Sequence, residues 1–127
     1  MSSKKEIVPI DVGLSKTPLS AVVKANGFLF VSGTPPREPG KSDIPLADIR
    51  RQTELVLDGI KRRLEAAGSS LDNVVKCTVY VTNAAYFDIV NEVYARYFLV
   101  EPPARTFVTV GSWPWPFDIE IDCIAVA

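Results

Sequence analysis

The chain has 127 residues, 47% of them apolar, with 14 basic and 15 acidic side chains and a formal net charge of −1. This length predicts a single domain over residues 1–127 with one sizeable core. A charge so close to zero disfavours nucleic acid as a partner, because binding to a phosphate backbone needs an excess of Lys and Arg. The basic run at residues 61–63 lies in a helical pattern and is typical of a solvated helix face.

Histidine is absent from the chain. This excludes a Ser-His-Asp triad, a Cys-His pair and a histidine zinc site, so acid–base chemistry would depend on carboxylate, Lys, Tyr, Cys or water. No apolar run is long enough to span a membrane, and no apolar segment follows the N-terminal lysines, so we expect a cytoplasmic protein. Cys77 and Cys123 lie in strand-like runs, which predicts two reduced, packed thiols and no metal site.

The first elements are predicted from strand and turn signals. Residues 7–11 can form a short strand, and residues 20–24 and 28–32 flank Asn26-Gly27, the strongest short-range signal for a β-hairpin. The proline-rich segment 33–45 is predicted to be a loop.

The remaining elements alternate between helix and strand. Apolar spacing predicts a helix from about residue 46 that ends at Gly68, then a strand over 74–82. Asn83 is expected to cap a second helix over 84–98. Two strands, 105–110 and 117–126, complete an α+β domain with both helices on one face of a mostly antiparallel or mixed sheet.

Arg105 begins the strand that follows a Pro-Pro pair, and it shares a face with Phe107 and Thr109. Two interpretations stay open for it. The side chain can extend along the strand end into water, or its planar fork of donors can bind a carboxylate in a bidentate way.

In the last strand, Asp118, Glu120 and Asp122 alternate with apolar residues, which is ordinary for a sheet with one wet face. Glu120 would gain a role if it faced a pocket with Arg105, where it could hold or deprotonate water. The loop before this strand carries Trp113 and Trp115, which predicts either a lid over a flat substrate or burial against a neighbouring subunit.

Several separated segments together resemble one family. The segments "AVVKANGFLFVSGTPP", "RRQTELVLDGIKRRLEAAGSSLDNVVKCTVYVTN", "FDIVNEVYARYF", "PPARTFVTV" and "DIEIDCIAVA" are similar to the RidA-like (YjgF-type) reactive intermediate deaminases. The resemblance implies a chorismate-mutase-like fold of the bacillar type, assembled as a homotrimeric barrel with active sites at the subunit interfaces. It also implies hydrolysis of enamines and imines to 2-keto acids and ammonia, without a cofactor.

The same resemblance implies roles for single residues. Arg105 would bind the substrate carboxylate, Glu120 would hold the water, Ser32 and Asn91 would line the pocket, and Phe107 would donate its backbone N–H to the substrate. Two departures concern substrate choice: Leu19 stands where the family commonly has a pocket tyrosine, and Trp113 and Trp115 lie between Arg105 and Glu120. They predict a more apolar pocket and leave two substrate classes open, 2-iminopropionate and the larger, conjugated amino-diacids of the aminomuconate type.

Three other functions remain as alternatives. The same fold could be a non-catalytic trimer that binds a small ligand and regulates another protein, which the loss of the tyrosine hydroxyl at Leu19 would favour. A ribonuclease is disfavoured by the absence of histidine and by the near-neutral charge. A holdase would need the tryptophan loop to be open.

Overall fold

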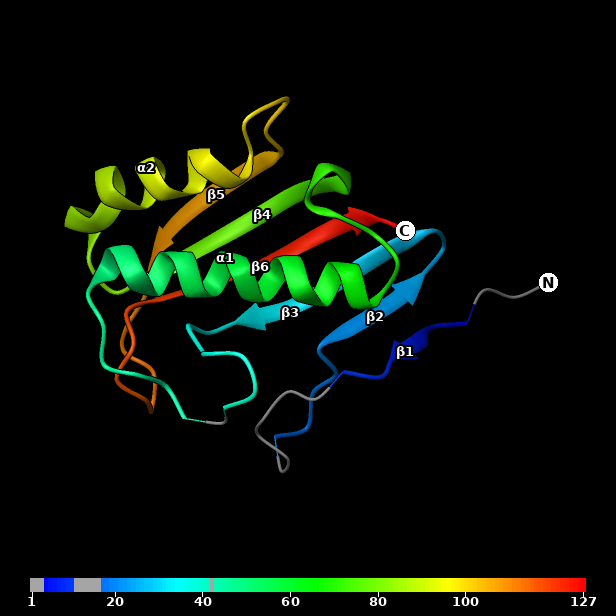
Figure 1. The fold of residues 1–127 in the computed structure, drawn as a ribbon, viewed down its shortest axis with the longest axis horizontal. Coiled ribbons are helices and arrows are strands. Elements are labelled where there is room, and N and C mark those ends of the chain that lie inside the picture. Colours follow the sequence, from blue (N-terminus) through cyan, green and yellow to red (C-terminus); the bar gives the residue numbers. More distant parts are fainter. Residues whose placement is uncertain (1–3, 11–16, 42) are drawn as a thin grey trace.

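The computed structural model describes residues 4–10, 17–41 and 43–127. Two helices cover one face of a single six-stranded sheet, and the other face carries no helix (Figure 1). The elements in chain order are β1 (Glu6–Val8), β2 (Val22–Ala25), β3 (Phe28–Thr34), α1 (Ile49–Ala66), β4 (Val74–Val81), α2 (Phe87–Tyr97), β5 (Ala104–Thr109) and β6 (Ile119–Val126). Short 3₁₀ helices at Leu71–Asn73 and Ala84–Tyr86 precede β4 and α2.

The strands lie in the order β1-β2-β3-β6-β4-β5. Only β4 and β5 are paired in parallel, because α2 connects them as a crossover; the other neighbours are antiparallel. The predicted α+β class, the mixed sheet and the placement of both helices on one face are confirmed. β5 is an edge strand, with α2 in front of it (Figure 1).

The predicted hairpin forms between β2 and β3. Asn26 and Gly27 both have positive φ, 51° and 79°, as a two-residue turn with the twist of a hairpin requires. The first strand is shorter than predicted, since it ends at Val8; Asp11 lies outside the described residues.

Local signals account for the ends of α1. The carboxylate of Asp48 accepts a hydrogen bond from the backbone N–H of Arg51 at 2.9 Å and caps the helix, which starts three residues later than predicted. Gly68 follows the C-cap with φ of +81°, as predicted. Neither helix of the described chain combines the length and the hydropathy needed to cross a membrane.

Asn83 caps a different element from the one predicted. Its side chain accepts from the backbone N–H of Ala85 at 2.9 Å and starts the 3₁₀ turn, while α2 itself begins at Phe87. The tighter turn brings Phe87 onto the side of α2 that faces β5, where its ring meets that of Phe107 edge-on at 5.0 Å.

The core lies between the helices and one face of the sheet. In β6 the odd-numbered residues Ile119, Ile121, Cys123 and Ala125 are buried there, and the even-numbered residues point to the opposite, open face. Arg63 of α1 is also buried, with 9% exposed, so the prediction that the whole basic run lies on a solvated face is wrong for this residue. Position 63 follows Ile60 by three residues and therefore falls on the apolar stripe of the helix.

The open face carries an apolar area over β2, β3 and β6. Phe30 pairs with Val23 on one side and with Ile124 on the other, and all three side chains are on this face. Phe28 and Phe30 are 42% and 45% exposed. Two large, exposed aromatic side chains on one face are typical of an interaction surface.

Cys77 and Cys123 are cross-strand neighbours in the β4–β6 ladder, and both are free and buried, as predicted. Burial raises the pKa of Cys77 to about 11 and raises the pKa of Cys123 as well. We expect a disulfide reagent at pH 8 to modify the native thiols more slowly than unfolded-chain thiols by roughly two orders of magnitude, because thiolate is the reacting form. Absorbance of the released reagent thiol, with and without guanidinium, measures this. Rapid modification of the native protein would contradict it.

Candidate active site

Arg105 lies on the helix-facing side of β5, because its partner in the parallel ladder is the buried Cys77. Its guanidinium carbon is 4.9 Å from the ring centre of Tyr94, 5.7 Å from that of Phe107 and 5.8 Å from that of Phe87. Contacts of this kind contribute roughly 0.5–2 kcal/mol each. Three rings therefore surround the charged group at the edge of the sheet, where Arg105 is half-buried.

No carboxylate neutralises Arg105 within the described part of the chain. The ion pairs found there join Arg50 to Glu92, Arg51 to Glu38 and Glu54, and Arg96 to Glu54. Aromatic faces orient a guanidinium but leave its in-plane N–H donors available. The N–H donors of Arg105 are thus available to an external anion.

Two further polar atoms lie beside Arg105 without a hydrogen bond from the described residues. Oδ1 of Asn91 and the hydroxyl of Tyr94 are both buried and unpaired. Asn91 is four residues after Phe87 and three before Tyr94, so all three share the side of α2 that faces β5. The thiol of Cys77, a weak hydrogen-bond partner, lies next to the Tyr94 hydroxyl. Unpaired buried polar atoms in a native fold indicate a place where a ligand or water completes the bonding.

Glu120 lies on the opposite face of the sheet, next to its β4 partner Tyr80. Its carboxylate packs directly over Gly33 of β3: a Cβ at that position would collide with Oε1 and lie 2.8 Å from Cδ. Glycine is therefore required there for Glu120 to keep this position. The described residues give Glu120 no hydrogen-bond partner, and burial raises the pKa of its carboxyl group.

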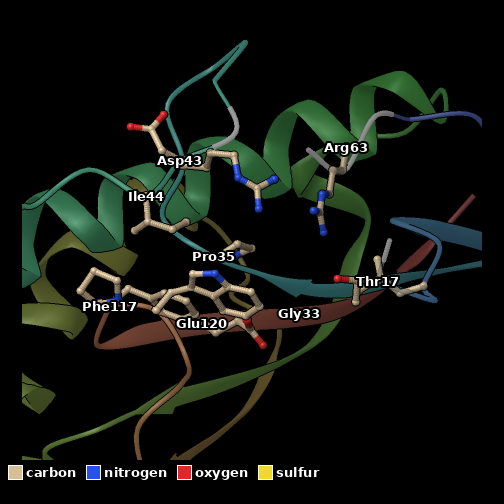
Figure 2. A pocket seen from close by; sticks show the side chains of 12 residues that line it. Thr17, Gly33, Pro35, Asp43, Ile44, Arg63, Phe117 and Glu120 are labelled. Atoms are coloured by element: carbon tan, nitrogen blue, oxygen red, sulfur yellow. The ribbon is translucent and has the colours of Figure 1, made fainter. Parts of the chain in front are cut away.

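A pocket of about 380 Å³ opens at Glu120. Figure 2 shows Glu120 on its strand side and Arg63 pointing into it from α1. Arg63 donates through Nη1 to the Ser32 carbonyl oxygen at 3.2 Å and to Oγ1 of Thr34 at 2.9 Å. Burial lowers the pKa of Arg63 to about 10, and the guanidinium of Arg37 acts in the same direction. At neutral pH Arg63 is still charged.

The tryptophan loop borders Glu120 on two sides. Trp115 lines the pocket with Arg63, and Trp113 lines a neighbouring hollow of about 330 Å³ in which Glu120 also takes part. Trp113 stacks on Phe117 with ring centres 4.6 Å apart. The loop is thus folded onto the site, and Trp115 remains 42% exposed.

Leu19 and Ser32 lie on the same side of the molecule as Glu120. Leu19 lines the pocket and is 44% exposed. The hydroxyl of Ser32 donates to the backbone carbonyl oxygen of Ser20 at 2.6 Å. Its proton is therefore engaged within the chain, and the neighbouring Gly33 forms the pocket wall instead.

The acidic row of β6 is not a simple solvated face. Asp118 accepts from Gln52 of α1 at 3.2 Å and from Thr82 at 2.8 Å, and Asp122 accepts from Tyr80 at 2.8 Å. These bonds hold the strand in register. Within the described chain, Glu120 is the member of the row that accepts no such hydrogen bond.

The seven residues predicted for the site form two groups on opposite faces of the sheet. Arg105, Phe107 and Asn91 lie between β5 and α2. Glu120, Leu19 and Trp113 line the pocket or the hollow around Glu120, and Ser32 lies beside them without lining either. Sequence reasoning missed the rings of Phe87 and Tyr94 and the contributions of Gly33 and Arg63. Only Arg63 had a signal in the sequence, a charge on the apolar stripe of a helix.

Comparisons with known proteins agree with this fold. A family model described as endoribonuclease L-PSP matches residues 13–127. A RutC family protein of Pyrococcus horikoshii is 46% identical over 108 residues, which cover 85% of this chain and 86% of that protein. The chloroplastic Reactive Intermediate Deaminase A of Arabidopsis thaliana is 37% identical over 98% of this chain and 67% of its own length. Since that relative is chloroplastic, the cytoplasmic location stays a prediction.

A solved structure from Thermotoga maritima, of a protein whose name also contains the word endoribonuclease, superposes on this chain with a TM-score of 0.89. It is 42% identical, and the match covers 96% of this chain and 97% of that one. The sheet order and the helix layer are therefore those of a solved protein.

The raised pKa of Glu120 makes a prediction about stability. A carboxyl group whose pKa is raised by folding contributes stability below its unfolded pKa, and this contribution is lost as the pH rises through the folded value. Glu120→Gln removes the charge without changing the shape. We expect its melting temperature to exceed that of the wild type at pH 7 and the difference to shrink at pH 4, measured by circular dichroism. An unchanged or lower melting temperature at pH 7 would contradict the analysis.

Proposed function

Because this chain belongs to the RidA/YjgF family and has reactive intermediate deaminases among its relatives, we propose that it hydrolyses carboxylate-bearing imines and enamines. The products are a 2-keto acid and ammonia. The observation that carries the proposal is Arg105, a cation that three rings hold in place and that the described residues leave without a carboxylate. A planar fork of donors suits a substrate carboxylate.

The proposed chemistry needs one water and one carboxylate. Water adds to the carbon of the protonated C=N bond, Glu120 accepts a proton from that water, and a neutral carbinolamine forms. Glu120 then gives this proton to nitrogen and takes the hydroxyl proton in its place, as the C–N bond breaks, ammonia leaves and the C=O bond forms. The raised pKa of Glu120 makes its carboxylate a stronger base than that of an ordinary glutamate. Oδ1 of Asn91 can accept an N–H of the substrate, which would satisfy its unpaired oxygen.

The proposal places each active site between two copies of the chain in a homotrimer. Arg105 and Glu120 lie on opposite faces of one sheet, so they cannot hold the same small substrate within a chain. A second copy seated on the open face would bring its own residues to the pocket around Glu120. The exposed rings of Phe28 and Phe30 on that face support such an interface.

Two rival functions can be separated by assay. A regulatory trimer of the same fold would bind keto acids or amino acids without releasing ammonia from an imine. The endoribonuclease description of the family is not proposed for this chain, because it has no histidine and a net charge of −1. Ammonia release from imines formed in situ by an amino-acid oxidase, beside RNA cleavage as a parallel measurement, decides among the three.

The first test concerns Arg105. We expect Arg105→Ala to lower kcat/KM for imine hydrolysis by roughly ten- to a hundredfold or more, since a charged hydrogen-bonded pair contributes about 1.5–3 kcal/mol. Arg105→Lys keeps the charge but loses the fork, so an intermediate loss is expected. Arg96→Ala, which removes an exposed arginine paired with Glu54, is the matched control. Full activity of Arg105→Ala would remove the clamp from the mechanism.

The second test concerns the shared site. Arg105→Ala and Glu120→Gln chains should each keep only a small residual activity alone, and a refolded one-to-one mixture should rise to about a quarter of the wild-type activity. In a random trimer a quarter of the interfaces pair an intact Arg105 with an intact Glu120 of its neighbour. Light scattering of the mixture gives the number of subunits. Absence of recovery in a mixed trimer would contradict a site built from two chains.

A further inference from the structure

Arg63 lies on the apolar stripe of α1, and the described residues satisfy only part of the hydrogen-bonding capacity of its guanidinium. Only Nη1 donates hydrogen bonds, to Ser32 and Thr34, and the described residues offer no acceptor to Nε or Nη2. Neither nitrogen is a buried atom that lacks a hydrogen-bond partner, so both remain accessible. Figure 2 shows the group directed from α1 into the pocket. One edge of the fork thus faces the space where a ligand would lie.

No charged neighbour among the described residues forms an ion pair with Arg63, although two carboxylates, Asp43 and Glu120, and a second cation, Arg37, line the same pocket. Glu120 attracts it from across the pocket, whereas Arg37, which lines the same pocket, repels it. A buried guanidinium such as that of Arg63, with no carboxylate within ion-pair distance among the described residues, is unfavourable unless an anion completes the site.

The rest of the pocket wall is mostly apolar. Leu19, Ile44, Trp115 and Phe117 contribute to it. Its volume of about 380 Å³ lies in the range of pockets that hold small organic ligands. Such walls suit a short carbon chain that leads to an anionic end at Arg63.

We infer that Arg63, with Arg37 nearby, binds a second carboxylate of the substrate, so that the preferred substrates are imines or enamines of dicarboxylic amino acids. The inference rests on the proposed function, since Glu120 in the same pocket would position the water. A carboxylate fits the site better than a phosphate, because Glu120 repels a group with two negative charges more strongly than a group with one. The first carboxylate would bind Arg105 of the neighbouring chain.

A purely structural role for Arg63 makes a different prediction. Its two hydrogen bonds tie α1 to β3 beside Gly33, so their loss would disturb Glu120 for every substrate alike. Binding of a second carboxylate would instead affect only substrates that carry one. The comparison of two matched substrates therefore separates the two roles.

The experiment compares imines formed in situ from glutamate and from norvaline, which has a methyl group in place of the side-chain carboxylate. We expect the wild type to prefer the glutamate imine. Arg63→Met should lower kcat/KM for it by roughly tenfold or more, the scale of a lost carboxylate–arginine contact, and change that for the norvaline imine by less than about twofold. Arg62→Met, an exposed neighbour on the same helix, should change neither.

Equal losses for both imines, or no loss for either, would overturn the inference. Arg63→Lys serves as the second variant if Arg63→Met does not fold. It keeps a cation but not the fork, and should lose activity on the glutamate imine only. An equal effect of Arg63→Lys on both imines would also overturn the inference.

A binding measurement keeps this inference separate from the proposed function. If the wild type hydrolyses neither imine, the proposed function fails, and calorimetry with 2-oxoglutarate and 2-oxopentanoate still tests the subsite. Tighter binding of 2-oxoglutarate that is lost in Arg63→Met would support a carboxylate site at Arg63. Equal affinities, or no binding of either keto acid, would refute it.

Discussion

The alternation of side chains along β-strands determines how this site can be built. Cys77 of β4 pairs with Arg105 on one side and with Cys123 on the other, so Arg105 shares its face with the odd-numbered residues of β6. Glu120 must then point to the other face. The register thus places Arg105, the proposed carboxylate-binding group, on the helix-covered face and Glu120, the proposed general base, on the open face. A site that uses both needs two chains, and the apolar open face provides the surface on which they can meet.

The arginines divide into two classes by their surroundings. Arg50, Arg51 and Arg96 form ion pairs on the helix surfaces, where such pairs contribute little to stability. Arg63 is buried and Arg105 is surrounded by three rings, and within the described residues neither has a carboxylate within ion-pair distance. Under the proposed function, both would bind carboxylates of the substrate.

Much of the fold could be predicted because its signals are local. The Asn26-Gly27 turn, the apolar period of α1 and the stop at Gly68 each depend on a few neighbouring residues. The start of the second helix was predicted less well, because an Asn such as Asn83 can cap either a 3₁₀ turn or an α-helix. The contact between Phe87 and Phe107, which the sequence does not show, favours the later start of α2. Arg105 was identifiable from its motif, but the rings that hold it come from α2 and could not be placed without the packing.

The sequence by itself determined the secondary structure, the family and the exclusion of histidine chemistry, because these depend on residue identity and short-range pattern. Only the tertiary structure decided which charges lie in the pocket and on which side of the sheet. The apolar stripe of α1 marks position 63, but the pocket that Arg63 enters is formed by distant segments. The closeness of Gly33 to Glu120 likewise arises from the pairing of β3 with β6, strands far apart in the chain. Electrostatic surroundings are set by such long-range contacts, and local pattern does not encode them.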